Sequence, residues 1–151
     1  MKKITILIAG DLGVGKSSFV TQNFSKTYVP TVGVDSKDVT FYTSHGKIVV
    51  TFLDMSGSFA YAQFHDQSAH EADAAIIMFD LTRPDETTAR LDYWEALCRR
   101  IPTVTVGNKA DLHDIHSDYM TMSVATGHNC TEPLEKLFSQ LFQQDKVTII
   151  I

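Results

Sequence analysis

The sequence predicts an α/β fold, a mostly parallel six-stranded sheet with helices on both faces. Apolar, strand-like runs alternate with stretches of helical spacing along most of the chain, an order typical of parallel sheets covered by helices. Val39–Thr43 and Ile48–Leu53 flank a short polar turn, as the strands of a hairpin do. A glycine-rich segment follows the first apolar run and leads into a helix. The length of 151 residues fits one domain, residues 1–151.

The expected elements follow from these runs. Strands are predicted at Ile4–Ala9, Val39–Thr43, Ile48–Leu53, Ala74–Leu81 and Thr103–Val106, with a weaker one at Tyr119–Ser123. Thr82-Arg83-Pro84-Asp85 has a capping-box pattern with an early proline, and predicts a helix that runs to about Arg100. Apolar residues recur on one face of a last helix at Leu134, Leu137, Phe138, Leu141 and Phe142. Sites in such folds lie at the carboxyl ends of the strands.

The composition excludes several classes of partner. The net charge is −5, from 13 Lys and Arg against 18 Asp and Glu, so we expect no nucleic-acid surface. No cysteine lies near the C-terminus and no apolar run reaches membrane length, so we expect no lipid anchor and a cytoplasmic or nuclear location. Cys98 and Cys130 are expected to be packing residues. The pairs His113/His116 and His128/Cys130 are expected to be loop residues rather than metal ligands.

Residues 10–17 form a phosphate-binding loop, Gly10-Asp11-Leu12-Gly13-Val14-Gly15-Lys16-Ser17, between a predicted strand and a predicted helix. Glycines allow the backbone to curl so that successive N–H groups point at phosphate oxygens. Lys16 is expected to bind the β- and γ-phosphates, and the Ser17 hydroxyl to bind Mg²⁺. The expected binding residues here are Asp11, Leu12, Gly13, Val14, Gly15, Lys16, Ser17 and Ser18.

A second motif, Asn108-Lys109-Ala110-Asp111, follows the strand Thr103–Val106. A carboxylate at Asp111 can accept hydrogen bonds from N1–H and N2–H₂ of guanine, a donor pair that adenine lacks. Lys109 is expected to pack along the base, and Asn108 to tie this loop to the phosphate loop. The motif argues against a small-molecule kinase, the other class that a phosphate loop alone allows.

With both motifs in order, the sequence resembles Ras-superfamily small GTPases, most of all the Ran branch and next the Rab branch. The similarity extends from about Lys3 to Phe142. Stretches similar to Ran are Thr31–Val34, Phe41–Thr43, Ala75–Asp80, Trp94, Ile101-Pro102 and Gly107–Lys109. The resemblance implies GTP or GDP with Mg²⁺ as cofactors. It also implies effector, exchange-factor or transport-receptor proteins that bind through two switch segments.

Further site residues are implied only by that resemblance. Thr31 corresponds to the switch threonine that senses the γ-phosphate and binds Mg²⁺. Phe24 and Tyr28 lie in the segment before it, Phe24 at the position that packs on guanine. Asp54 corresponds to the aspartate that reaches Mg²⁺ through water, and Gly57 to the glycine whose N–H meets the γ-phosphate. Ser123, Val124 and Ala125 correspond to the loop that contacts the base oxygen, although its usual lysine is absent.

Four departures from the family pattern bear on activity and fold. Ser58 stands where a glutamine orients the attacking water, so the expected catalytic set is Ser58, Lys16 and Thr31. Leu12 occupies a position where small residues are usual. Lys16 and Thr31 are only fifteen positions apart, which shortens the first helix or the loop after it. Eleven residues separate Asp111 from Ser123, so we expect one helix to be missing there.

Two functional hypotheses remain open, a nucleotide switch with slow GTP hydrolysis and a binding module locked with GTP. Ser58 and Leu12 separate the two hypotheses and favour the locked module. The apolar tail, residues 145–151, is expected to be disordered, an extra strand, or a cover over the surface left by the missing helix. We expect the last of these, with the three terminal isoleucines buried.

Overall fold

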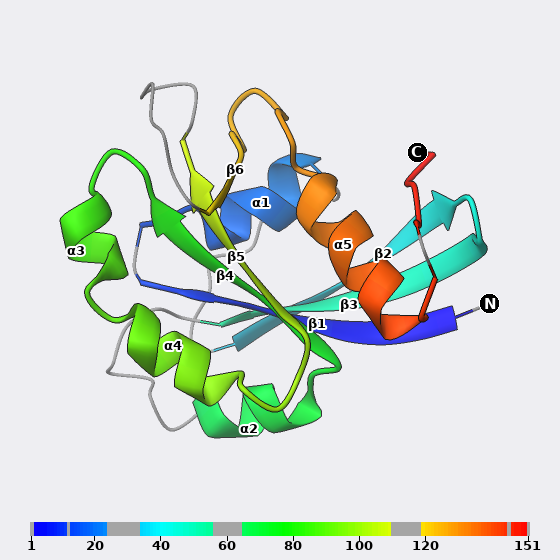
Figure 1. Cartoon of the computed structure of the whole chain (residues 1–151), viewed down its shortest axis with the longest axis horizontal. Helices are drawn as coiled ribbons and strands as arrows, with labels where there is room; N and C mark the ends of the chain where they lie inside the picture. The colour runs from blue at the N-terminus through cyan, green and yellow to red at the C-terminus, as the bar shows by residue number, and fades with distance from the viewer. Residues whose placement is uncertain are drawn as a thin grey trace.

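The computed structural model describes residues 2–11, 13–23, 34–55, 65–109, 119–144 and 146–150. Its centre is a six-stranded sheet in the order β2-β3-β1-β4-β5-β6 (Figure 1). The strands are β1 (Lys2–Gly10), β2 (Val34–Thr43), β3 (Gly46–Met55), β4 (Ala74–Asp80), β5 (Thr103–Asn108) and β6 (Met120–Thr121). Among these six strands, as far as the described residues extend, β2 and β3 pair antiparallel and the other neighbours pair parallel. The predicted fold class is confirmed.

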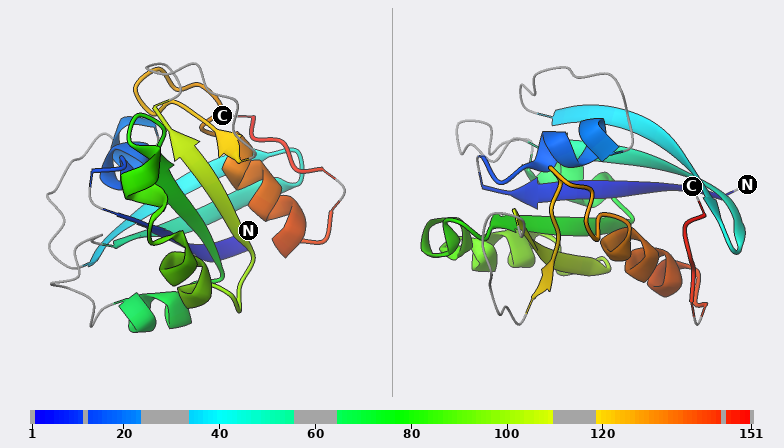
Figure 2. Two further views of the ribbon diagram at one scale, coloured as in Figure 1. Left: turned by 60° about the vertical axis from the view of Figure 1, so that its left-hand side comes forward. Right: turned by 90° about the horizontal axis from the view of Figure 1, so that it is seen from above.

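In the part of the chain that the structure describes, five helices cover the two faces of the sheet: α1 (Lys16–Asn23), α2 (His65–Glu71), α3 (Pro84–Thr88), α4 (Leu91–Leu97) and α5 (Glu132–Leu141). On one face, Phe19 of α1 and Phe138 of α5 join a core with alternate residues of the central strands. On the other face, Trp94 of α4 packs on residues such as Leu7 and Ile77. Figure 2 shows the helices on opposite sides of the sheet. Every residue of β4 is buried, as expected for a strand covered on both faces.

The single helix predicted from Pro84 to Arg100 is wrong, because the structure has two short helices, α3 and α4. Nor does the capping box form: Thr82 donates its hydroxyl to Asp80 Oδ1 at 2.6 Å, and no side chain caps α3. Thr87 donates its hydroxyl to the Arg83 carbonyl at 2.8 Å and accepts from the Asp80 N–H at 2.9 Å. Hydroxyl groups that bond to backbone in this way compete with regular helix.

The β5–β6 end of the sheet is the region where a helix was expected to be missing. By register, Thr103, Thr105 and Thr121 share the face that α2 and α4 cover, and all three are half-buried. Right-handed crossovers place any helix between β5 and β6 on this face. The expected absence itself falls on residues 110–118, outside the described residues.

The C-terminal tail lies on the opposite face, so the expectation that it covers the missing helix is wrong. Residues 146–150 run beside the β2–β3 hairpin (Figure 1), where Thr43 and Ile149 form an antiparallel bridge. The Ile150 N–H donates to the Tyr42 carbonyl at 2.7 Å. Val147 is buried with the α1/α5 core, whereas Ile149 is half-buried and Ile150 is 66% exposed. The tail is therefore held against the hairpin by an isolated bridge and backbone hydrogen bonds, and is anchored by Val147.

Both cysteines are buried packing residues, as expected. Burial raises the pKa of the Cys98 thiol to about 12 and that of Cys130 to about 11. No group of three or more His, Cys, Asp or Glu within the described ranges could hold a metal ion; His128 is exposed, and His113 and His116 fall outside those ranges.

Candidate functional site

The carboxyl ends of the parallel strands bring the sequence motifs to one edge of the sheet. Strand β1 leads into the phosphate loop, and Asp54 lies near the end of β3, paired in register with Ile8. Asp80 and Asn108 end β4 and β5 and are directly paired. Since these strands are parallel, their terminal side chains gather at a common edge, as predicted.

The phosphate loop has the backbone shape that its glycines predict. Gly13 and Gly15 have positive φ angles of 75° and 104°, a region that favours glycine. A Cβ atom at Gly15 would lie 2.4 Å from Asn108 Nδ2, so Gly15 is also required by close packing against the second motif.

Lys16 is buried behind this loop, with 7% of its surface exposed. Its ammonium group donates to the Asp11 carbonyl at 2.8 Å. Burial lowers its pKa from 10.5 to about 8, although the charges of Asp54 and Asp11 act in the opposite direction. An ammonium group has three donors, and the described residues supply one acceptor for them. A buried cation with spare donors beside a curled glycine loop suits a polyphosphate.

Asn108 connects three segments of the site. Its Nδ2 donates to the Val14 carbonyl at 2.9 Å, and its Oδ1 accepts from the Val124 N–H at 3.0 Å. This side chain is 3% exposed, so both bonds are shielded from water. The predicted tie between Asn108 and the phosphate loop is present, and the Ser123–Ala125 loop is held to the same group. Ser123 is buried and Ala125 is exposed.

Asp80 is a buried carboxylate that sequence reasoning did not identify. It accepts from Lys109 Nζ at 2.6 Å, from the Thr82 N–H at 2.8 Å and from Arg83 Nε at 3.2 Å. Burial alone would raise the pKa of Asp80, but the hydrogen bonds from Lys109 and Thr82 and the Lys109 charge outweigh it and lower the pKa from 3.8 to about 2. Asp80 therefore stays ionised and fixes the Lys109 ammonium, which also lies 3.4 Å from the Gly13 carbonyl.

Two arginines reach the phosphate loop. Arg83 Nη2 lies 3.5 Å from the Gly13 carbonyl, and Arg90 Nη1 lies 3.7 Å from Asp11 Oδ2. The other Asp11 oxygen accepts from Trp94 Nε1 at 2.9 Å. Asp11 thus directs its carboxylate toward α4, a role that its place in the motif did not reveal. In the sequence, Arg83 lies 70 residues from Gly13 and Trp94 lies 83 residues from Asp11. No local pattern could therefore predict either contact.

Trp94 also links the phosphate loop to α2. Its ring centroid lies 5.1 Å from that of His65, the first residue of α2. His65 is fully buried and its Nδ1 lies 2.7 Å from the Tyr93 hydroxyl. The start of α2 is therefore packed against the same helix that holds Asp11.

Several predicted site residues cannot be placed. Leu12, Phe24, Tyr28, Thr31, Gly57, Ser58 and Asp111 lie outside the described residues. Ser17 is part of α1, but its side chain is outside the description, and Ser18 is half-buried one position later. Asp54 is buried at the same edge and close enough to Lys16 to affect its pKa.

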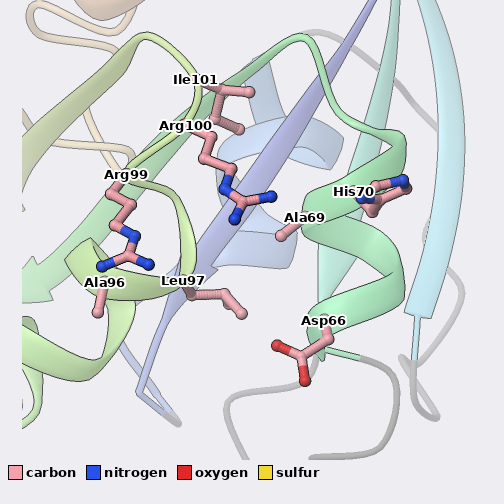
Figure 3. Close-up of a pocket in the computed structure, with 8 residues that line it drawn as sticks. All are labelled: Asp66, Ala69, His70, Ala96, Leu97, Arg99, Arg100 and Ile101. Atoms are coloured by element: carbon pink, nitrogen blue, oxygen red, sulfur yellow. The ribbon is translucent and has the colours of Figure 1, made fainter.

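A separate cleft lies between α2 and α4 (Figure 3). Its floor is formed by small and apolar residues that include Ala69, Leu97 and Ile101, and its rim carries Arg99 and Arg100. Both arginines are exposed and precede the amino end of β5. They therefore lie at the edge of the sheet opposite Arg83 and Arg90. No helix in the described part of the chain is long and apolar enough to cross a membrane.

The model of the Ras family matches residues 5–147, which is nearly the whole chain. The matched region includes the phosphate loop, Asp80, Asn108 and the Ser123–Ala125 loop.

Proposed function

The chain belongs to the Ras family of small GTPases, nucleotide-binding switches, and we propose that this member holds GTP or GDP with Mg²⁺ and hydrolyses GTP slowly. The observation that carries the proposal is the double hydrogen bond of Asn108. It joins the phosphate loop at Val14 to the 123–125 loop at Val124. A ligand that needs a phosphate site and a base site held at fixed separation is a nucleotide.

The phosphate end of the proposed site rests on Lys16 and the loop backbone. Lys16 is positioned by the Asp11 carbonyl and has donors to spare. Mg²⁺, when bound, supplies positive charge that neutralises phosphate oxygens. Ser17, Thr31 and Asp54 (through water) are the proposed ligands, and Asp54 is buried beside Lys16. Oxygen donors of this kind suit Mg²⁺.

The base end is proposed to select guanine through Asp111. Lys109, whose ammonium is fixed by Asp80 and Gly13, provides an aliphatic stem beside the base. The Val124 N–H is already bonded to Asn108, so the exposed Ala125 is the residue of that loop whose N–H can meet the base. Phe24 and Tyr28 are proposed to cover the base from the preceding segment.

Slow hydrolysis is proposed from Ser58 and Leu12. The short hydroxyl of Ser58 does not span the distance that a water-orienting glutamine does, and Leu12 crowds the approach to the γ-phosphate. Ran-type or Rab-type partners, namely effectors, exchange factors or transport receptors, are proposed to bind through the segments around Thr31 and Gly57. If hydrolysis is vestigial, the same surface would serve a module locked with GTP.

The test is the identity of the nucleotide that copurifies with the protein. Protein purified without added nucleotide is denatured, and the released compounds are separated by ion-exchange chromatography. We expect guanine nucleotides in near-stoichiometric amount, with GTP retained. An adenine nucleotide, or an empty protein that also fails to bind added GDP, would refute the proposal.

A further inference from the structure

Arg83 lies directly on the phosphate loop. A Cβ atom added to Gly13 would lie 3.1 Å from Arg83 Nη2, so the guanidinium group packs over the Gly13 Cα atom. Only 42% of the Arg83 side chain is exposed. The residue comes from the turn between β4 and α3, and neither the phosphate-loop motif nor the guanine motif includes it.

One nitrogen of this guanidinium group is anchored and the others are weakly engaged. Arg83 Nε lies 3.2 Å from the buried Asp80 carboxylate. By contrast, Nη2 lies 3.5 Å from the Gly13 carbonyl and Nη1 lies 3.6 Å from Glu86. Both distances are long for hydrogen bonds between nitrogen and oxygen. The group is therefore held in place while its outer donors are available to a stronger acceptor.

The local charges favour an anion as that acceptor. The carboxylate of Asp80 is shared between two cations, because Lys109 Nζ also binds it at 2.6 Å. Arg83 and Lys109 both approach the Gly13 carbonyl, at 3.5 Å and 3.4 Å. The Glu86 carboxylate also lies 3.6 Å from Arg83, but it is 73% exposed and screened by water, so the two cations dominate the electrostatic field beside the loop. A forked guanidinium group binds phosphate more strongly than it binds a neutral carbonyl.

We propose that Arg83 is a further phosphate-binding residue of the nucleotide site, in which its guanidinium group exchanges the Gly13 carbonyl for an oxygen of the phosphate chain. This inference rests on the proposed function and adds one residue to it. Asp80 is the positioning residue that holds Arg83 and Lys109 within reach of the phosphate chain. The consequence is slow release of nucleotide, because the phosphate chain is held by Lys16 from inside and by Arg83 from the solvent side.

The experiment measures dissociation of GDP carrying a fluorescent group on its ribose, chased with excess unlabelled GDP in the presence of Mg²⁺. Arg83→Ala should release it about ten times faster or more, the loss expected for one charge-assisted hydrogen bond. Arg99→Ala removes the same charge at the opposite edge of the sheet and should leave the rate unchanged. Arg83→Lys keeps a point charge and should lie between the two.

A second readout separates phosphate contact from a structural role. The ³¹P NMR resonances of bound GDP should shift in Arg83→Ala and stay in place in Arg99→Ala. If Arg83→Ala does not fold, Arg83→Lys carries the test, because it retains a cation for Asp80 but loses the forked donors. The role of Arg83 would be refuted if the Arg83 variant and Arg99→Ala had the same release rates and the same ³¹P spectra. Failure of the unmodified protein to bind GDP would instead refute the proposed function.

Discussion

Asn108 Nδ2 donates a hydrogen bond of 2.9 Å to the carbonyl oxygen of Val14, which lies 94 residues earlier in the chain. The same amide accepts from the Val124 N–H at 3.0 Å. Two segments that are remote in sequence are therefore joined through one buried side chain, and the separation between the phosphate loop and the 123–125 loop depends on it.

Asn108→Ala should reduce both stability and nucleotide affinity. It leaves the Val14 carbonyl and the Val124 N–H without a partner, and each unsatisfied buried group costs about 1–3 kcal/mol. Urea unfolding and calorimetric GDP binding measure the two effects. Asn108→Asp keeps an acceptor for Val124 but turns a carboxylate toward the Val14 carbonyl, so it should impair binding as well. Gln140→Ala, an exposed amide on α5, is the control. Wild-type stability in Asn108→Ala would contradict the structural role.

The Asp80 carboxylate should make stability fall in strong acid. Its pKa is lowered from 3.8 to about 2, so its contribution is fully present above pH 3.8 and is lost as the pH falls toward 2. The contribution is about 2 kcal/mol for a shift of this size. Asp80→Asn should therefore be less stable than the unmodified protein at pH 6, and the difference should shrink toward pH 2.

Urea unfolding between pH 2.5 and 6 measures the Asp80 effect. Asp85→Asn, which changes an exposed carboxylate in the first turn of α3, is the matched control for the loss of one acidic side chain. If the free energies of unfolding of Asp80→Asn and of the unmodified protein differed by the same amount at every pH, the pKa of Asp80 would not be lowered by folding.

The strands were predictable because their apolar runs are local. Their ends were less so: β2 begins at Val34, five residues before the predicted start. The polar stretch before Val39 joins the sheet because β3 supplies its ladder partners. A side-chain bond of 2.7 Å, donated by the Thr51 hydroxyl to Asp38 Oδ1, adds to the pairing. Pairing between strands, not local propensity, decides such residues.

The site was predictable where a motif encodes backbone shape, and not where it depends on contacts distant in sequence. Gly13, Gly15 and Lys16 are placed as their pattern indicates. Arg90 gave no local signal, because its partner Asp11 lies on another strand end. The tail was misjudged because hydropathy alone does not state which face of the sheet an apolar segment will cover.

Guanine selectivity should depend on Asp111. We expect GTP and GDP to bind far more tightly than ATP, because adenine offers no donor pair to a carboxylate at this position. Asp111→Asn should shift the preference toward xanthine nucleotides, whose base carries an oxygen where guanine has an amine. Competition calorimetry with GDP, ADP and XDP measures the preference. Equal affinity of the unmodified protein for GDP and ADP would contradict the assignment.

Deleting Val147–Ile151 should lower the melting temperature. Burial of Val147 is worth about 1.5–3 kcal/mol, and each kcal/mol corresponds to about 2–4 °C in a chain of this size. The deletion also removes the hydrogen bonds between the tail and the hairpin, such as that from Ile150 to Tyr42. Ile150→Ala, at a residue that is 66% exposed, should have little effect. A deletion variant that melts with the unmodified protein would mean that the tail is not docked in solution.

Hydrolysis of GTP should be slow and should respond little to GTPase-activating proteins. Ser58 replaces the glutamine that orients the attacking water, and a misplaced nucleophile loses much of the positioning on which phosphoryl transfer depends. We expect the leucine at position 12 to crowd the place where an arginine finger would enter, and such a finger is worth about 10³–10⁵ in rate. Arg83 does not change the expected slow hydrolysis. Its guanidinium group is anchored on Asp80 and contacts Gly13, so we expect it to retain the phosphate chain and not to orient water.

A single-turnover assay measures the rate directly. Protein loaded with GTP should keep most of it over a period in which ordinary members of the family convert theirs to GDP. Ser58→Gln combined with Leu12→Gly should raise the rate by restoring the water-orienting amide and opening the approach. Arg83→Ala should speed the loss of bound nucleotide without raising GDP formation, which separates release from hydrolysis. Rapid conversion to GDP by the unmodified protein would show that another group supplies the missing positioning, and would favour an ordinary switch cycle over a module locked with GTP.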